Sequence, residues 1–221
     1  MSSETRDASP WVCGRVPDRM AHEGLWEQLV GLDRQRTAVR AKCQYLSDPE
    51  RYVITMLNTE YVVNLSDKQI FPIQPGSPPT PAEFLEQLCL LAYLINAQDL
   101  LLANKLVKPE ALPSGQFFFR GLHSLPTDKL ERTFGQCPER LYRAIEQFGA
   151  KQREFGDASV ELYVLPRIPL TIVVWRGGDE FPARASILFD QTAAAHMPLD
   201  ALLAAVTLAV DKLVRASGQS G

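Results

Sequence analysis

The spacing of apolar residues changes from block to block along this chain, and this switching limits the folds that the sequence can form. Between Met20 and Ala41 apolar side chains recur at helical spacing. The next block holds short runs rich in β-branched and aromatic residues, separated by polar turns: Tyr52–Leu57, Tyr61–Leu65 and Ile70–Ile73. We therefore expect a helix followed by an antiparallel meander.

The rest of the chain, from about residue 80, contains longer elements. Thr80 and Pro81 form a helix start, and the helix from Phe84 to Ile95 is apolar over most of its circumference, so it should be the central buried helix. Two shorter helices are expected over residues 128–134 and 138–148. Strands are expected over residues 160–164, 170–175 and 183–190, before a last amphipathic helix over residues 198–214.

Blocks of strands and helices without a repeating strand–helix–strand order predict an α+β fold. The two meanders could pair into one antiparallel sheet, packed against the central buried helix and the C-terminal helix. We expect a flexible N-terminal arm over residues 1–18, a single α+β domain over residues 19–217 and a disordered tail over residues 218–221.

Charge and hydropathy restrict the partners and the compartment. With 23 basic and 26 acidic residues the formal net charge is −3, so no strong positive field would attract a nucleic acid. No apolar run reaches the ~20 uncharged residues of a membrane span, and the first residues lack the apolar core of a secretory signal. These features predict a cytoplasmic protein with no nucleic acid partner and no membrane partner.

The motifs of the well-marked enzyme classes are absent from the sequence. It contains no glycine-rich phosphate loop, no nucleophile elbow and no zinc-binding helix motif. Cys13, Cys43, Cys89 and Cys137 lie far apart, whereas metal-binding thiolates usually come in close pairs. We expect free thiols, and the residues identify no cofactor.

The densest group of polar residues follows the last predicted strand. Asp190, His196 and Asp200 could gather at one end of that strand. An imidazole near carboxylates suits acid–base chemistry, so these three are the candidate catalytic residues. The structural alternative is that Asp190 accepts hydrogen bonds from loop amides, and that His196 or Asp200 serves the N-terminus of the last helix.

The segment 117–123 places aromatic rings beside a cation and an imidazole. Phe118, Arg120 and His123 are candidate ligand-binding residues, because rings stack on a planar ligand while a guanidinium holds its anionic group. Arg167, which lies between two prolines in an extended corner, is a fourth candidate for an anion contact. The alternative is that alternate Phe rings enter the core, that Arg120 pairs with an acidic residue and that Arg167 belongs to a structural kink.

Several of these blocks carry a family resemblance. The chain contains Phe-Phe-Arg-Gly at residues 118–121, Gly-Asp-Ala at 156–158, Leu-Pro-Arg-Ile-Pro-Leu at 165–170 and Asp-Glu-Phe-Pro-Ala-Arg-Ala-Ser-Ile-Leu-Phe-Asp at 179–190. Over residues 20–215 it resembles the bacterial and archaeal DUF3786 family, whose members are functionally uncharacterised. Some relatives carry an added iron–sulfur domain like that of corrinoid iron–sulfur proteins. The resemblance therefore implies anaerobic one-carbon, corrinoid or redox-cofactor metabolism, although this chain lacks the clustered cysteines of such a domain.

We expect a binding or accessory domain whose pocket lies between the two polar segments described above. Its ligand would be anionic and planar, such as a tetrapyrrole or a corrinoid-related compound, or it would be a metal. In this hypothesis Arg120, His123, Asp190 and His196 line one pocket, and the candidate metal ligands are His123, His196 and Asp190.

Two alternatives from other functional classes stay open. The first is a small-molecule hydrolase or lyase in which His196 is the general base, oriented by Asp190 or Asp200, while Arg120 stabilises negative charge. The second is a protein-interaction scaffold, which should show an exposed apolar patch and bind a protein partner.

Overall fold

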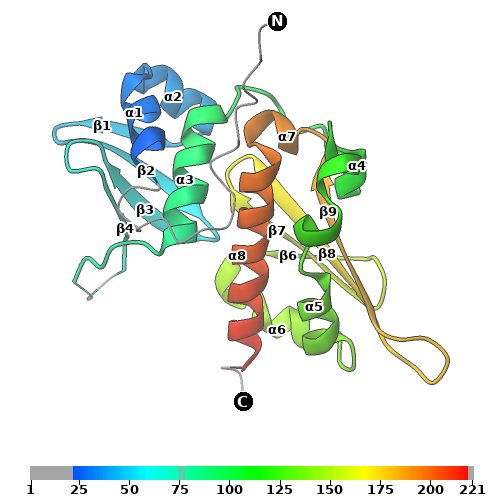
Figure 1. Ribbon diagram of the computed structural model, residues 1–221. Helices are drawn as coiled ribbons and strands as arrows, with labels where there is room; N and C mark the ends of the chain where they lie inside the picture. The colour runs from blue at the N-terminus through cyan, green and yellow to red at the C-terminus, as the bar shows by residue number, and fades with distance from the viewer. Residues whose placement is uncertain (1–21, 75, 77, 219–221) are drawn as a thin grey trace, which may run out of the picture.

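The computed structural model describes residues 22–74, 76 and 78–218 (Figure 1). The predicted arm over residues 1–18 lies outside the described residues, as do residues 219–221 of the predicted tail. Gly218, which we assigned to that tail, is the last residue of helix α8. The helices and the two antiparallel sheets of the described part form the predicted α+β fold.

The N-terminal sheet has four strands in sequence order. They are β1 (Gln44–Ser47), β2 (Glu50–Met56), β3 (Thr59–Asn64) and β4 (Gln69–Pro72). The last three are the predicted meander, and β1 is an additional edge strand. Alternate residues of β2 and β3 are buried, because successive side chains of a strand point to opposite faces. Figure 1 shows three helices against this sheet: α1 (Glu23–Gly31), α2 (Arg34–Ala41) and α3 (Phe84–Asn96).

Asp33 divides the helix that we predicted between Met20 and Ala41 into α1 and α2. Its backbone is extended, with φ of −65° and ψ of 124°, and its Oδ1 accepts a hydrogen bond from Arg36 N at 2.7 Å. Aspartate is among the preferred N-cap residues because its carboxylate accepts from a free amide of the first turn. Apolar spacing alone does not detect such a break.

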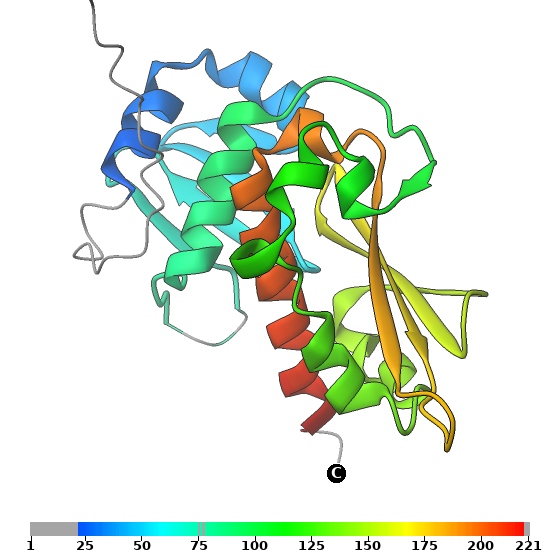
Figure 2. The same cartoon turned by 45° about the vertical axis from the view of Figure 1, so that its right-hand side comes forward.

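The C-terminal sheet has five strands in the order β5–β9–β8–β7–β6. They are β5 (Leu106–Val107), β6 (Lys151–Arg153), β7 (Ala158–Leu165), β8 (Ile168–Trp175) and β9 (Arg184–Asp190). The three long strands are those that the sequence predicted. Figure 2 shows three helices on one side of this sheet: α5 (Thr127–Phe134), α6 (Arg140–Ala144) and α8 (Leu199–Gly218).

Short elements connect the longer ones. They are the α-helices α4 (Gly115–Phe118) and α7 (Ala193–His196) and the 3-10 helices η1 (Pro109–Ala111), η2 (Gly121–His123) and η3 (Glu146–Phe148). The segment 117–123, in which we singled out candidate site residues, therefore forms α4 and η2. His196 is the last residue of α7.

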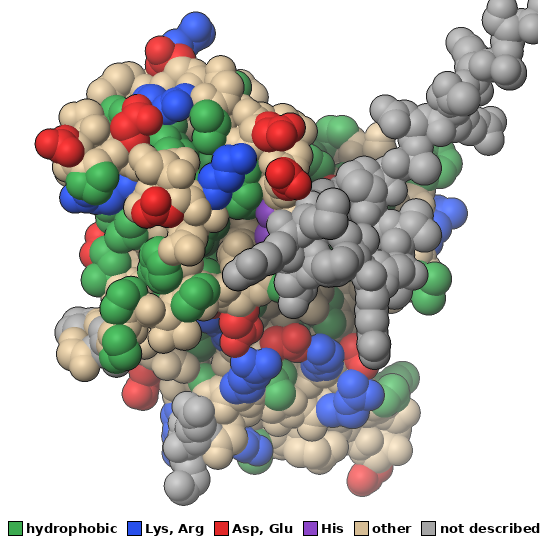
Figure 3. Space-filling view, turned by 60° about the vertical axis from the view of Figure 1, so that its left-hand side comes forward, with side chains coloured by type: hydrophobic (Ala, Val, Ile, Leu, Met, Phe, Trp, Pro, Cys, Tyr) green, Lys and Arg blue, Asp and Glu red, His purple; other side chains and the backbone are tan. Residues whose placement is uncertain are grey.

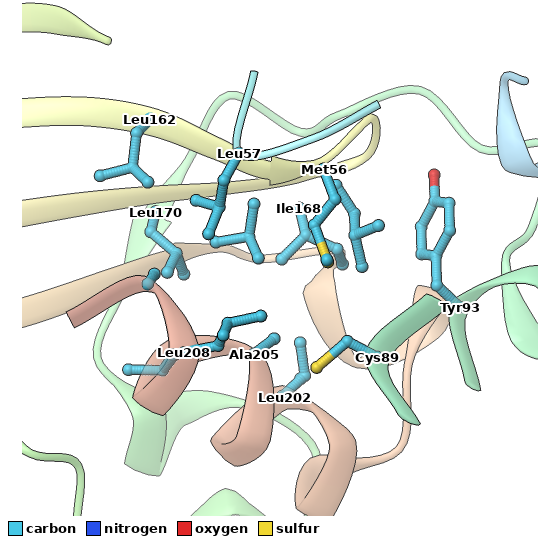
Figure 4. Close-up of a cluster of buried hydrophobic side chains, with 14 of the residues drawn as sticks. Met56, Leu57, Cys89, Tyr93, Leu162, Ile168, Leu170, Leu202, Ala205 and Leu208 are labelled. Atoms are coloured by element: carbon cyan, nitrogen blue, oxygen red, sulfur yellow. The ribbon is translucent and has the colours of Figure 1, made fainter. Parts of the chain in front are cut away.

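The two meanders form two sheets rather than the single sheet that the sequence left possible. They meet where the β2–β3 turn reaches the end of β7 (Figure 4). Leu57 and Asn58 make this turn with φ of 48° and 62°, and Leu57 N donates to Val164 O at 3.0 Å. Because the contact is made by one turn and not by a strand edge, the two hydrogen-bond ladders remain separate.

One cluster of buried side chains joins both sheets to the two long helices (Figure 4). It includes Met56, Leu57, Cys89, Tyr93, Leu162, Ile168, Leu170, Leu202, Ala205 and Leu208. Helices α3 and α8 lie side by side between the sheets (Figures 1 and 2). They are the predicted central helix and the predicted C-terminal helix, and most of their apolar residues are buried.

Glu86 on α3 has a buried carboxylate that bonds to both the N-terminal sheet and α8. Its Oε1 accepts from the Tyr61 hydroxyl and from Lys212 Nζ, both at 2.7 Å, and its Oε2 accepts from Glu83 N at 2.9 Å. Burial raises the pKa of this carboxyl group, but the three donors outweigh burial and leave the pKa below its ordinary value. The carboxylate therefore links β3, α3 and α8.

The surface carries charges of both signs. On the face shown in Figure 3, acidic and basic side chains are interspersed, which agrees with the net charge of −3. No helix within the described residues has the length and apolar character needed to cross a membrane.

Candidate functional site

A cavity of about 630 Å³ opens where the two sheets meet, and we call it the junction cleft. The β2–β3 hairpin forms one side and the β7–β8 hairpin forms another. It is completed by Lys42, which follows α2, by residues 97–105 between α3 and β5, which we call the α3–β5 loop, and by the end of η3. The lining residues are Lys42, Thr55, Asn58, Leu101, Leu102, Asn104, Phe148, Gly149, Tyr163, Leu165, Pro166 and Arg167.

The lining of the junction cleft carries positive charge. It contains Lys42 and Arg167 but no aspartate or glutamate. Lys42 is exposed and forms no ion pair with any residue that the structure describes. Its backbone is left-handed, with φ of 53°, because it ends α2 and donates its N–H to the carbonyls of Ala38 and Val39. The Lys42 ammonium is therefore available to an anion in the cleft.

The remaining lining supplies an apolar floor and a hydroxyl group. Phe148 and Leu165 are buried, whereas Tyr163 is 41% exposed. Burial, followed by the negative charges of Glu161 and Asp190, raises the pKa of Tyr163. Its hydroxyl group therefore stays protonated at neutral pH and can donate a hydrogen bond.

One end of the cleft is fixed by a contact between two turns. Asn58 Nδ2 donates to Gln147 O at 3.0 Å. Gly149 has φ of 59°, and a Cβ at this position would lie 3.0 Å from Asn58 Oδ1. Both the left-handed backbone and the close approach favour glycine, so the two sheets are held at a fixed spacing here.

Arg167 holds the α3–β5 loop, which forms one wall of the cleft. Its Nη1 donates to Leu100 O and its Nη2 to Asp99 Oδ1, each at 2.7 Å. Its Nε donates to Arg40 O at 2.8 Å and so fixes the end of α2 as well. The guanidinium is engaged by protein groups, and its positive charge is paired with the Asp99 carboxylate, which agrees with the structural alternative for Arg167.

Asp190 holds the same loop further along the chain. Its Oδ1 accepts from Ala103 N at 3.1 Å, and from the N–H and the hydroxyl of Thr192 at 2.9 Å and 2.6 Å. The side chain is buried, and burial raises its pKa, but the hydrogen bonds from Thr192 and the loop amides lower the pKa below its ordinary value. This is the amide-accepting role that we gave as the alternative to catalysis.

His196 is the third residue that holds the α3–β5 loop. It is fully buried, and its Nδ1 accepts from Gln98 N at 3.3 Å. Its Nε2 has no hydrogen-bond partner within the described part of the chain. Burial, and next the charge of Arg167, lower the pKa of His196, while Asp190 opposes this shift. Three residues that the sequence singled out therefore act on one loop.

Phe118, His123 and Asp200 meet at a second site, an apolar hollow of about 230 Å³ between α3, α4, η2 and α8. The His123 ring stacks on the Phe118 ring with centroids 4.6 Å apart and an interplanar angle of 3°. Asp200 Oδ1 accepts from Ala201 N at 2.8 Å, beside the start of α8. The hollow is completed by Leu88, Ala201, Leu203 and Ala204.

The residues of the predicted pocket are thus divided between two places. His123 lines the apolar hollow, whereas Asp190 and His196 are buried against the α3–β5 loop and do not line that hollow. Arg120 is exposed and lies outside the lining of the hollow. The two predicted segments do come together, through Asp200 instead of Asp190 or His196. Any ligand role of these residues stays a prediction.

Sequence reasoning missed most of the junction cleft. Lys42, Asn58 and Tyr163 come from three distant parts of the chain, and none belongs to a recognisable motif. Arg167 was the one lining residue that the sequence suggested. The available signal was the polar Asn58 directly after a β-rich run, which is typical of a tight hairpin turn.

The described residues offer no ready metal site. No group of three His, Cys, Asp or Glu side chains in residues 22–74, 76 and 78–218 could hold a metal ion. Cys43, Cys89 and Cys137 are free thiols, and Cys13 lies outside the described residues. Burial raises the pKa of Cys43 and of Cys89 to about 12, so these thiols stay protonated and are poor ligands.

Comparison with protein families gives a match over most of the chain. The model of a family described as a domain of unknown function, DUF3786, matches residues 33–212. The chain belongs to the DUF3786 family. This result confirms the resemblance drawn from the sequence blocks, and the matched DUF3786 region includes every lining residue of the junction cleft and of the apolar hollow. Neither a curated protein nor a solved structure matches the chain.

Proposed function

We propose that this DUF3786 protein is a binding domain for a small organic anion, which occupies the junction cleft. The observation that carries the proposal is the lining of a cavity of about 630 Å³. It contains no carboxylate and holds the exposed Lys42, which forms no ion pair with a described residue, while Arg167 is paired with Asp99. Ligand sites are typically clefts of about 300–1,000 Å³ with an apolar surface and a few polar groups, and they often lie where two structural units meet.

Different lining residues would contact the charged, the polar and the apolar parts of the ligand. Lys42 provides an ammonium group for the anionic end of the ligand. Asn58, Asn104 and Tyr163 provide hydrogen-bonding groups at the rim, and Phe148 contributes to an apolar floor for the body of the ligand. Such a site favours an anion with a flat apolar part.

The catalytic alternative has less support than binding. A general base must come within hydrogen-bond reach of the proton that it removes, and the fully buried His196 lines neither the cleft nor the hollow. The exposed Phe117 and Leu122 suit the scaffold alternative, but nothing in the structure indicates what would cover them. A cytoplasmic location and a role in anaerobic, corrinoid or redox-cofactor metabolism remain parts of the proposal.

Calorimetric titration with benzoate and benzamide tests the proposal, because the two compounds have nearly the same shape and differ in charge. We expect benzoate to bind and benzamide to bind at least about tenfold more weakly, since about 1.4 kcal/mol corresponds to a tenfold change in affinity. Protoporphyrin IX, followed by its absorption spectrum, forms a separate arm for the tetrapyrrole hypothesis. Equal affinity for benzoate and benzamide would contradict an anion site.

The matched variants are Lys42→Gln and Lys68→Gln. Both lysines are exposed and have a left-handed backbone, with φ of 53° and 51°, so both substitutions affect the backbone equally. Lys68 lies in the β3–β4 turn and does not line the cleft. We expect Lys42→Gln to weaken benzoate binding about tenfold and Lys68→Gln to leave it unchanged. The same loss in both variants would indicate a general charge effect.

A further inference from the structure

Three buried residues from separate elements hold the α3–β5 loop: Arg167, Asp190 and His196. They differ in whether their charge can change near neutral pH. Arg167 is always charged, and the hydrogen bonds to Asp190 hold it in the ionised form at neutral pH. Histidine is the side chain whose charge changes most readily between pH 5 and 8. Among these three residues, only His196 can therefore change its charge near neutral pH.

We propose that His196 is a proton-sensitive positioning residue: while neutral it holds the α3–β5 loop in the wall of the junction cleft, and in acid it releases the loop together with the bound anion. The loop part of this proposal stands on the hydrogen bonds of the loop. The anion part rests on the proposed function.

The hydrogen bond between Gln98 and His196 requires an unprotonated Nδ1. Because Nδ1 accepts from Gln98 N, the ring proton of the neutral form is on Nε2. Protonation makes both ring nitrogens donors, so Nδ1 could no longer accept and would face another N–H group. The Gln98 amide would then lose its partner.

The surroundings of His196 strengthen this effect. Its charged neighbours are Arg167, from the turn between β7 and β8, and Asp190, at the end of β9. A second positive charge would be repelled by Arg167, and the carboxylate of Asp190 already accepts hydrogen bonds from Ala103 and Thr192. Burial and the Arg167 charge accordingly place the pKa of His196 below its ordinary value of 6.5. Loop protection is thus expected to decrease progressively as the pH falls below 6.5, the ordinary pKa that His196 regains when the loop is released.

Release of the loop would change the junction cleft directly. Leu101, Leu102 and Asn104 belong to this loop and line the cleft. The same loop supplies Leu100 O and Asp99 to the guanidinium of Arg167, so its release would also remove the contacts that fix this side chain beside the cleft. Loop order and anion affinity should therefore change over the same pH range.

Hydrogen exchange of the full-length protein tests the loop. Exchange of the amides of residues 98–104 is followed by mass spectrometry at pH 7.5 and pH 5.5, corrected for intrinsic rates, with β3 as the internal reference. We expect protection of the loop to fall several-fold, and by no more than about tenfold, at the lower pH, since a single histidine can contribute up to about 1.4 kcal/mol over this range, and we expect β3 to stay protected. Equal protection of the loop at both pH values would overturn the proposal.

Two histidine variants assign the effect to one imidazole. In His196→Asn the side-chain oxygen can accept from Gln98 N without titrating, so the loop should stay protected at pH 5.5. His123→Asn changes the exposed histidine at the apolar hollow and should behave like the natural protein. If His196→Asn does not fold, NMR titration of the natural protein decides, because the imidazole and the loop must then share one midpoint. Different midpoints would overturn the proposal.

Benzoate titrations at the same two pH values separate the two parts of the inference, since benzoate stays ionised throughout. We expect affinity to fall with loop protection in the natural protein and to stay constant in His196→Asn. Benzoate binding that is independent of pH would overturn the proton-sensitive release. Absence of benzoate binding at both pH values, with a loop that still responds to pH, would overturn the proposed function and support the loop part alone.

Discussion

Asp190, at the end of β9, and Asp200, at the start of α8, are two carboxylates in different environments. Asp190 is buried and accepts three hydrogen bonds from two elements of the chain. Asp200 is partly exposed at the start of a helix and accepts one hydrogen bond from the next residue. Loss of a hydrogen-bond partner costs most when the remaining group is buried.

We therefore expect Asp190→Ala to lower the free energy of unfolding by about 3 kcal/mol and Asp200→Ala to lower it by less than about 1 kcal/mol, as measured by urea denaturation at neutral pH. Because the folded-state pKa of Asp190 lies below its ordinary value of 3.8, its stabilisation is fully present above that value and is lost as the pH falls below it. The natural protein should thus lose more stability than Asp190→Asn between about pH 6 and pH 3. Parallel losses would contradict this role.

At the scale of the elements, two ion pairs anchor α8 in different environments. Lys212 pairs with Glu86, whose side chain is 7% exposed. Asp211, which is 33% exposed, pairs with Lys129, which is 40% exposed. Removing one partner of a buried pair leaves an uncompensated charge. An exposed pair is screened by water and contributes little.

Lys212→Met should lower the free energy of unfolding by about 2–3 kcal/mol, because it leaves the Glu86 carboxylate buried without its cation. Lys129→Met removes the cation of the neighbouring exposed pair and should cost less than about 1 kcal/mol. Urea denaturation of both variants at neutral pH measures the difference. Equal losses would show that Glu86 keeps its charge compensated without Lys212.

The elements themselves were largely predictable, because each long one has a local pattern. The continuous apolar character of the segment from Phe84 to Ile95 predicted α3. Runs rich in β-branched and aromatic residues predicted β2 and β3, and alternating residues predicted β7. The junction cleft was not predictable in the same way, since it depends on how the turns of two sheets meet. Nothing near Lys42 in the sequence indicates that Tyr163 lines the same cleft. Arg167, Asp190 and His196 drew attention through their residue types, and their structural roles became visible only with the α3–β5 loop in place.

At the scale of the whole molecule, the β2–β3 turn connects the two sheets. Leu57 is 4% exposed and donates its N–H to β7, and its side chain lies in the cluster shared by both sheets (Figure 4). Our prediction of one domain over residues 19–217 stays a prediction, which a test of cooperativity can examine. A single domain of this size should unfold in one transition.

Leu57→Ala removes the shared contact without changing the backbone requirement at this position, and it should cost about 2–5 kcal/mol. Leu122→Ala, at a fully exposed side chain, should be silent. Unfolding is followed by fluorescence in variants that retain only Trp26, on α1, or only Trp175, on β8. We expect the two transitions to coincide in the natural protein and to separate in Leu57→Ala. Separate transitions in the natural protein would refute the single-domain prediction.

The contacts of the β2–β3 turn also affect how the length of the chain can vary. Hairpin tips usually tolerate added residues, because they project into solvent and contact little else. Here Leu57 is buried and donates to β7, and the exposed Asn58 donates to Gln147 O, so both residues of the tip are held by other parts of the chain. The exposed β3–β4 turn at Asp67 and Lys68 has no such neighbours among the described strands. Insertions, epitope tags and lineage-specific extensions should therefore accumulate at the second hairpin, while the first keeps its two-residue length.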